Sequence, residues 1–179
     1  DLLDVSPANG IAKFSNEVSR DRVLNESELE KVLNATFKMR YPFGPLFRIL
    51  LMTGQRLNEV SGLTWSEIDM PSATWKIPRD RAKNKASHLV HLSQPVLEEL
   101  ERLRKISRHD LIFTTTGKTA VSGFSRAKRQ LDNLSGVGDW RLHDLRRTFA
   151  TVATEQLGFQ PVIVDRILNH VSGSVKGIA

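Results

Sequence analysis

The sequence predicts an α+β domain that is mainly helical and holds one small antiparallel β-sheet. Apolar residues recur at helical spacing through most of the chain, in the ranges 25–37, 43–52, 94–104, 122–134, 142–157 and 161–168. Only residues 74–92 change character, because Trp75 and Ile77 alternate with polar neighbours and 89–92 form a second β-prone run. No segment repeats, so we expect one layered domain.

Local signals mark where several of these helices begin and end. Asn25 and Glu28 have the spacing of a capping box, in which each side chain accepts a hydrogen bond from the other residue's backbone N–H. The apolar face that follows includes Phe37. Residues 43–52 are apolar on nearly all sides, which predicts a core helix, and Gly54 is expected to end it.

The two β-prone runs flank a strongly basic segment. Residues 79–87 read RDRAKNKAS, with four cations against one acid. The simplest structure for this stretch is a β-hairpin whose tip carries the basic residues, among them Lys83. Residues 1–22 show no lasting period and contain Pro, Gly and several Ser, so we expect a linker there and the domain over 23–179.

Composition limits the classes of function. The chain has 179 residues, of which 40% are hydrophobic and 26% charged, as in an ordinary globular domain. It has no Cys, which excludes disulfides and thiolate metal sites, and it has no apolar run near the length of a membrane span. The net charge of +6 favours a polyanionic partner, although many basic domains bind none.

Arg56 is the first candidate site residue. It follows Gly54 at the start of a short helix, where backbone N–H groups already favour an anion. Glu59 lies three residues on and could pair with Arg56 and hold its rotamer. The alternative is an exposed Arg–Glu pair that contributes very little.

Lys83 is the second candidate, because a hairpin tip could deliver its ammonium group to a phosphate or a leaving oxygen. The alternative is a solvated charged turn. His143 and Arg146 are the third pair: their i, i+3 spacing puts both on one helical face, while Leu145, Phe149 and Val152 should pack into the core. An imidazole and a guanidinium together suit a phosphoryl group. The alternative is a capped helix whose His bonds a backbone carbonyl.

His170 stands at a predicted helix C-terminus, followed by a turn at Gly173. A protonated His there interacts favourably with the helix dipole, which is the alternative to a functional role. We expect no zinc site, since the sequence has no HExxH motif and the five histidines lack ligand spacing: His88, His91, His109, His143 and His170.

Taken in order, four segments resemble the catalytic boxes of tyrosine recombinases, specifically the phage and genomic-island integrases. They are TGQRLNEVSGLTW (53–65), RAKNKASHLVHL (81–92), HDLRRTFAT (143–151) and ILNHVSG (167–173). The resemblance implies the fold of the integrase DNA breaking–rejoining catalytic domain, with Arg56, Lys83, His143, Arg146 and His170 as catalytic residues. It also implies that these side chains converge on one scissile phosphate.

The resemblance further implies a mechanism without metal or cofactor. Arg56 and Arg146 would hold the phosphate oxygens, Lys83 would protonate the departing 5′-oxygen, and His143 and His170 would hydrogen-bond the phosphate. A Tyr would attack and form a 3′-phosphotyrosyl link. The partner would be double-stranded DNA, bound by a homotetramer of the full-length protein without any membrane association. Such a protein would act in the bacterial cytoplasm.

The chain departs from this family in one respect. Its only Tyr is Tyr41, which precedes the first box and matches no nucleophile, so we expect the nucleophile beyond Ala179 and no strand cleavage by this fragment. Two other classes stay open. One is a non-catalytic DNA-binding or regulatory remnant of the same fold. The other is an unrelated helical phosphate-ester enzyme that depends on a metal.

Overall fold

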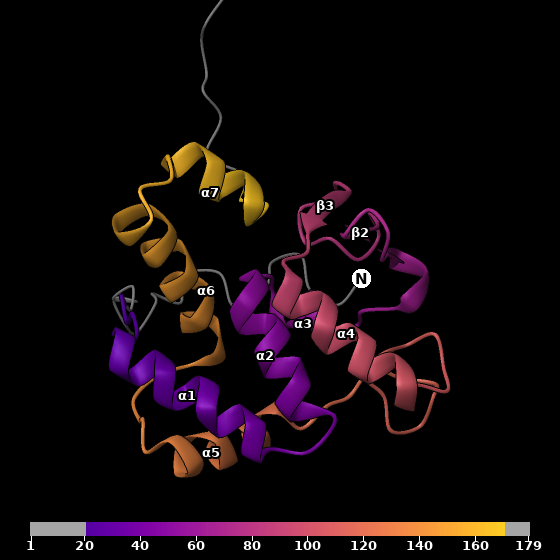
Figure 1. Cartoon of the computed structure of the whole chain (residues 1–179), viewed down its shortest axis with the longest axis horizontal. Helices are drawn as coiled ribbons and strands as arrows, with labels where there is room; N and C mark the ends of the chain where they lie inside the picture. Colours follow the sequence, from indigo (N-terminus) through magenta and orange to yellow (C-terminus); the bar gives the residue numbers. More distant parts are fainter. Residues whose placement is uncertain (1–20, 171–179) are drawn as a thin grey trace, which may run out of the picture.

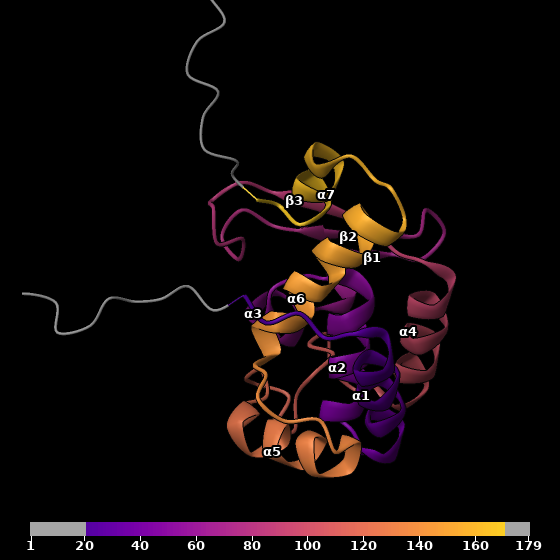
Figure 2. The same ribbon diagram turned by 90° about the vertical axis from the view of Figure 1, so that its left-hand side faces the viewer.

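The computed structural model describes residues 21–170, and within them the fold is mainly helical, as predicted (Figure 1). The predicted linker 1–22 and the turn at Gly173 lie almost wholly outside this range. The α-helices are α1 (Glu26–Lys38), α2 (Phe43–Thr53), α3 (Leu57–Ser61), α4 (Gln94–Ile106), α5 (Phe124–Ser135), α6 (Leu142–Thr151) and α7 (Pro161–Ile167). The sheet and α7 lie at the opposite end of the molecule from α5 (Figures 1 and 2). None of the helices described has the length and hydropathy needed to traverse a bilayer.

The antiparallel sheet has three strands in the order β1 (Ile68–Asp69), β2 (Thr74–Ile77) and β3 (His88–His91). Trp75 pairs with Val90 and Ile77 pairs with His88, so Trp75, Ile77 and Val90 are buried, as period-2 alternation predicts. Residues 78–87 form the loop between β2 and β3, which confirms the basic hairpin. The two-residue strand β1, joined to α3 by the 3₁₀ turn η1 (Trp65–Glu67), was not expected.

Helix α2 is the centre of the core. It contacts α1, α3, α4 and α6, and its side chains are buried on nearly all sides because the segment is apolar on nearly all sides. Gly54 ends the helix in the left-handed conformation, with φ of 63°, and its N–H donates to the carbonyl of Leu50. The turn leaves room for the side chains of Leu168 and Phe149 directly against Gly54.

Two helices differ from the sequence-based expectation. The capping box of α1 is present, with Glu28 N donating to Asn25 Oδ1 (2.9 Å), but Phe37 is 61% exposed and lies under the Arg48 guanidinium instead of in the core. The predicted helix 142–157 is α-helical only to Thr151. It then widens into the π-helical turn η2 (Val152–Gln156), where Leu157 N donates to Val152 O.

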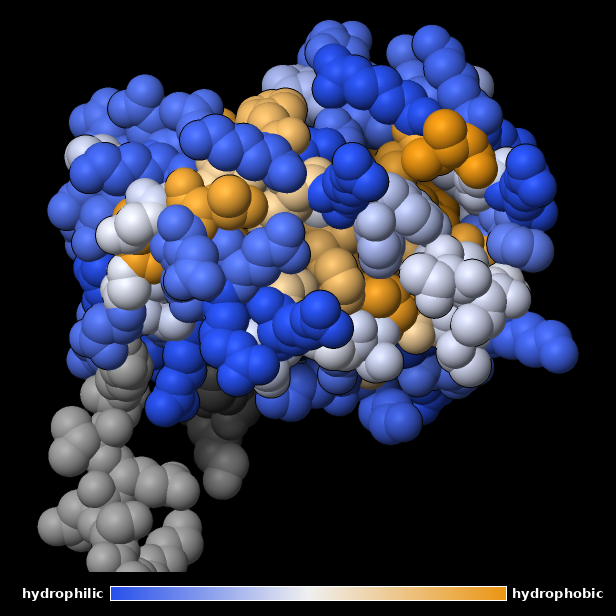
Figure 3. All heavy atoms as spheres, turned by 90° about the horizontal axis from the view of Figure 1, so that it is seen from below, coloured by the Kyte–Doolittle hydropathy of each residue, from blue (hydrophilic) through white to orange (hydrophobic). Residues whose placement is uncertain are grey.

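Burial at the end of α6 is also lower than predicted. Leu145 is buried, but Phe149 and Val152 are only half-buried. The reason is that they line an apolar cavity of about 260 Å³ between α1, α2 and α7, together with exposed Leu157 and Phe159. On the underside of the molecule, where α5 lies, hydrophilic residues surround smaller apolar areas (Figure 3).

We predict that Gly54→Ala destabilises the fold by well over the ~1–2 kcal/mol that a left-handed alanine costs by itself. An added Cβ would lie 2.8 Å from both Leu168 Cδ2 and the Phe149 ring. Gly136→Ala is the matched control, because Gly136 has φ of 68° and no heavy atom within 4 Å of the added Cβ. Urea unfolding of both variants measures the difference. Equal losses of stability would contradict the tight contact at Gly54.

Candidate phosphate-binding site

Four side chains from different parts of the chain meet at the C-terminal end of α7. They donate to three consecutive backbone carbonyls, those of Ile167, Leu168 and Asn169, which we call the α7 carbonyls. The last carbonyls of a helix have no partner within the helix, and here side chains supply the missing donors. The donors are Gln55 Nε2 and His88 Nε2 to Ile167 (2.9 and 3.0 Å), an Arg146 Nη to Leu168, and Arg56 Nη2 to Asn169 (3.0 Å).

Arg56 is fixed from two directions. Its Nη1 lies 3.0 Å from Glu59 Oε1, while the other carboxylate oxygen of Glu59 accepts the backbone N–H of Arg56 at 3.0 Å. Glu59 is only 1% exposed, so this is a half-buried ion pair and not the solvated pair that was the alternative. The pairing expected from the i, i+3 spacing is confirmed.

Arg146 is buried, with 4% of its surface exposed. Its Nη1 donates to Gly54 O at 2.8 Å, and its Nη2 donates to Leu168 O. Burial, followed by the nearby positive charge of Arg56, lowers the pKa of Arg146 to about 10, and Glu59 partly opposes this. Arg146 therefore remains charged at neutral pH. The two guanidinium groups, 90 residues apart in sequence, bond the carbonyls of adjacent residues, Leu168 and Asn169.

His143 lies one turn before Arg146 on α6 and is exposed. Partial loss of hydration lowers its pKa, and the charges of Arg147, Arg146 and Lys83 act in the same direction. The imidazole is therefore mostly neutral at pH 7 and can exchange a proton. Lys83 itself is exposed on the hairpin loop, near enough to His143 for its charge to act on the imidazole.

His170 follows Asn169 directly, beside the α7 carbonyls. Its Nδ1 lies 3.0 Å from Asp165 Oδ1, and its backbone N–H donates to Asp165 O at 2.8 Å. The imidazole of His170 therefore contacts Asp165 of α7 and not Arg56 or Arg146. Of the five predicted residues, Arg56 and Arg146 meet at the α7 carbonyls, His143 and Lys83 lie within electrostatic reach of Arg146 or of each other, and His170 lies at the edge of the site.

Sequence reasoning missed four further residues of this site, the first of which is Gln55, a donor to Ile167 O. In the sequence His88 is only one of five histidines without metal-ligand spacing, yet it bonds an α7 carbonyl, and burial lowers its pKa. Asn84, next to Lys83, pairs with Asn169 through both side-chain amides. Only the left-handed φ of Asn169 (51°) had a sequence signal, since Asn is the residue other than Gly that adopts it most readily.

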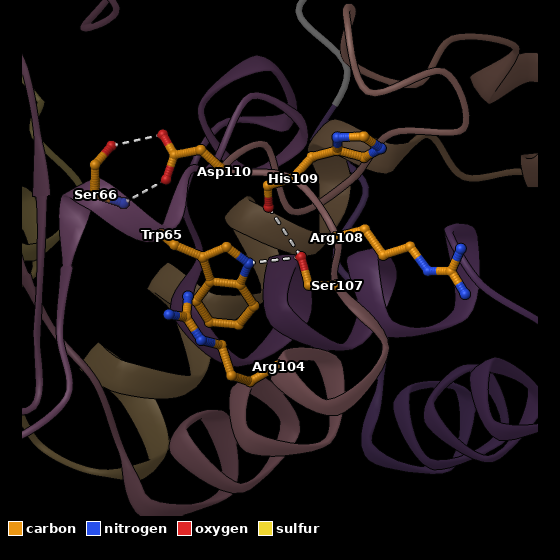
Figure 4. A pocket seen from close by; sticks show the side chains of 7 residues that line it. All are labelled: Trp65, Ser66, Arg104, Ser107, Arg108, His109 and Asp110. Atoms are coloured by element: carbon orange, nitrogen blue, oxygen red, sulfur yellow. Dashed lines mark hydrogen bonds between the residues drawn. The ribbon is translucent and has the colours of Figure 1, made fainter.

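The arrangement is suited to holding a phosphoryl group. Each guanidinium carries five N–H donors, more than the contacts above use, and both are held by groups that are themselves fixed. The neighbouring ammonium and neutral imidazole can donate and accept protons. A separate hollow of about 560 Å³ near α4 is also lined by Arg104 and Arg108, but the Arg104 guanidinium lies 4.7 Å from the centre of the Trp65 ring (Figure 4). There Trp65 donates to Ser107, and Ser66 donates to Asp110.

Comparisons with known proteins identify the family of the chain. The Phage integrase family matches residues 22–176. The chain is 31% identical to the prophage integrase IntA of Escherichia coli K12 over 175 residues, which cover 95% of this chain and 42% of IntA. It is 27% identical to the tyrosine recombinase XerA of Saccharolobus solfataricus, over 83% of this chain and 48% of XerA. The chain thus spans less than half the length of these relatives.

Solved structures show the same fold. XerH, a site-specific recombinase bound to its difH substrate in a pre-cleavage complex, superposes with a TM-score of 0.69 at 25% identity, over 84% of this chain and 47% of XerH. The catalytic core of lambda integrase superposes with a TM-score of 0.66 at 19% identity, over 86% of this chain and 94% of that core. The chain belongs to the phage integrase family of tyrosine recombinases and has the fold of the integrase catalytic core.

Proposed function

We propose that this chain is the catalytic domain of a site-specific DNA recombinase, an integrase of a prophage or related mobile element. The observation that carries the proposal is the meeting of Arg56 and Arg146 at the α7 carbonyls, in a member of this family. The charges of Arg146 and Lys83 both act on the nearby His143. The domain is assigned to residues 23–179, preceded by a linker over 1–22.

In the proposed reaction, Arg56 and Arg146 donate to the non-bridging oxygens of the scissile phosphate. Negative charge on these oxygens increases in the pentacoordinate transition state, and prearranged donors stabilise it without having to reorganise. Burial of Arg146 strengthens this effect, because fewer water molecules screen its charge. Two guanidinium groups supply the positive charge, and the proposal includes no cofactor or metal.

The covalent step exchanges one phosphodiester for another. A tyrosine oxygen bonds to phosphorus, the bond from phosphorus to the 5′-oxygen breaks, and Lys83 gives its proton to that oxygen. His143, neutral at pH 7, accepts the phenolic proton, and His170 hydrogen-bonds the phosphate once its imidazole turns from Asp165. The 3′-phosphotyrosyl link keeps the bond energy, so a second strand can be joined without ATP.

Tyr41 does not fit the role of nucleophile. Its hydroxyl lies 2.8 Å from Ile112 O and 2.7 Å from Thr114 O, and it also accepts the N–H of Thr114. These bonds attach it to the loop between α4 and α5. Since it is the only tyrosine of the sequence, the proposed reaction takes its nucleophile from a residue that residues 1–179 do not contain, and these residues alone cleave no strand.

The proposed partner is double-stranded DNA in the bacterial cytoplasm, and the proposed assembly is a homotetramer of the full-length protein. Lambda integrase, with a TM-score of 0.70, forms a tetramer bound to a Holliday junction. The second candidate function is a non-catalytic DNA-binding or regulatory remnant of the same fold. The engagement of the only tyrosine in a structural contact favours it.

Binding to duplex DNA should be steeply salt-dependent, because phosphate neutralisation releases counterions. Arg146→Ala should weaken binding to all sequences to a similar extent, since a phosphate contact does not distinguish bases. Fluorescence anisotropy with several duplexes over a salt series measures both. An altered base preference in this variant would count against a phosphate contact.

Covalent capture tests the catalytic assignment. The parent protein, including any tyrosine encoded with this chain, should form adducts with a nicked suicide substrate from its own element's junction, visible on denaturing gels. Arg56→Ala and Arg146→Ala should each reduce adduct formation about 10²–10³-fold or more. Arg102→Ala, an exposed arginine on α4, is the control and should leave it unchanged. If the parent protein has the tyrosine but forms no adduct, the remnant replaces the enzyme.

Lys83→Ala should also slow adduct formation, for a different reason. A general acid matters less when the leaving group is better, so a substrate with sulfur in place of the 5′-oxygen should recover much of the rate. Arg146→Ala should show no such recovery. Lys85→Ala is the control, because Lys85 is an exposed lysine of the same loop. A Lys83→Ala rate equally low on both substrates would exclude proton donation by Lys83.

A further inference from the structure

The loop that carries Lys83 has few contacts of its own. Its base is anchored by Arg81, which donates to Glu59 O at 2.9 Å and pairs with Glu67 at 2.9 Å. Beyond Ala82, the loop's own bonds are Lys85 N to Ala82 O at 3.0 Å and Ala86 N to Asn84 Oδ1 at 3.3 Å, and Lys83 and Lys85 are both exposed. These two short-range bonds shape the turn but do not fix it relative to the rest of the site, so contacts outside the loop decide where the Lys83 ammonium lies.

Asn84 makes such a contact, directly after Lys83. Its Nδ2 donates to Asn169 Oδ1 at 2.6 Å, and Asn169 Nδ2 donates back to Asn84 Oδ1 at 3.2 Å. This reciprocal pair, which we call the Asn84–Asn169 amide pair, joins two residues 85 positions apart. Both side chains are part-buried, and each uses a donor and an acceptor, so one geometry is strongly favoured.

The partner residue is itself fixed to the arginines. Arg56 holds the carbonyl of Asn169, and Arg146 holds the carbonyl of Leu168. The Asn169 side chain therefore has a defined position relative to both guanidinium groups. Just beyond the loop, at the start of β3, His88 Nε2 bonds Ile167 O at 3.0 Å, so the hairpin contacts residues 167 and 169 at two separate points.

From this geometry we propose that Asn84 and Asn169 are positioning residues, which hold the loop so that Lys83 reaches the leaving oxygen of a phosphate bound by Arg56 and Arg146. The inference rests on the proposed function of Lys83 as a general acid. The pair itself touches no substrate atom. It acts through Lys83, its neighbour in the chain, and it links the position of the acid to the position of the phosphate donors.

The first test measures cleavage by the parent protein on normal DNA and on DNA with sulfur in place of the 5′-oxygen. Asn169→Gly removes the amide but keeps the left-handed backbone at no steric cost. Asn169→Gly and Asn84→Ala should each slow cleavage of normal DNA roughly five- to tenfold, as expected for lost hydrogen bonds. Each variant should slow cleavage of the sulfur substrate only slightly. The double variant should be no slower than the slower single variant. Asn133→Ala, an exposed asparagine on α5, is the control.

The second test does not depend on catalysis. Trypsin cleavage after Lys83 and Lys85 in the folded chain should be several-fold faster in Asn169→Gly and Asn84→Ala, and again not additive in the double variant. If both asparagine variants show wild-type rates in both tests, the positioning role is overturned. The proposed function is tested separately by the loss of adduct formation in Arg146→Ala. If an asparagine variant cleaves both the normal and the sulfur substrate slowly, the defect lies at the arginines, and this result also overturns the positioning role. If the wild-type protein forms no adduct, the proposed function fails, and unchanged trypsin rates would then refute the contact itself.

Discussion

The end of helix α7 imposes the constraint on which the rest of the site depends. A helix cannot satisfy its own last carbonyls, and in most proteins water or a capping turn does so. Here four side chains supply the hydrogen bonds to these carbonyls, from the segment before α3, from β3 and from α6. They are Gln55, Arg56, His88 and Arg146. Each of these side chains loses freedom by making the bond. The same bonds that complete α7 therefore orient the two guanidinium groups.

Burying Arg146 is costly unless its charge is well hydrogen-bonded. Two carbonyls, those of Gly54 and Leu168, accept from its guanidinium, and the nearby negative charge of Glu59 partly offsets the positive charge of Arg56. The left-handed turn at Gly54 contributes twice, since it ends α2 and presents its carbonyl to Arg146. Core packing and the site are thus connected through one glycine.

Much of this could be predicted from sequence because the signals were local. The capping box of α1, the all-apolar α2, the hairpin and the Arg56–Glu59 pair depend on spacings of a few residues, and all are present. The missed features depend on distant partners. His88 bonds a carbonyl 79 positions away, and a backbone carbonyl gives no sequence signal because every residue has one. The π-helical turn after Thr151 and the exposure of Phe37 were likewise decided by tertiary packing.

The apolar cavity beside α6 has a consequence for folding. Val164 and Leu168 pack with Ala153 in a small cluster separate from the main core, and the cavity separates that cluster from α1. Helix α7 is therefore held mostly by polar bonds at one end and by little buried apolar surface along its length. Segments of this kind open as independent units at a lower free energy than the whole domain. An anion at the arginines would shift that opening equilibrium, so occupancy of the site and order in α7 are thermodynamically linked.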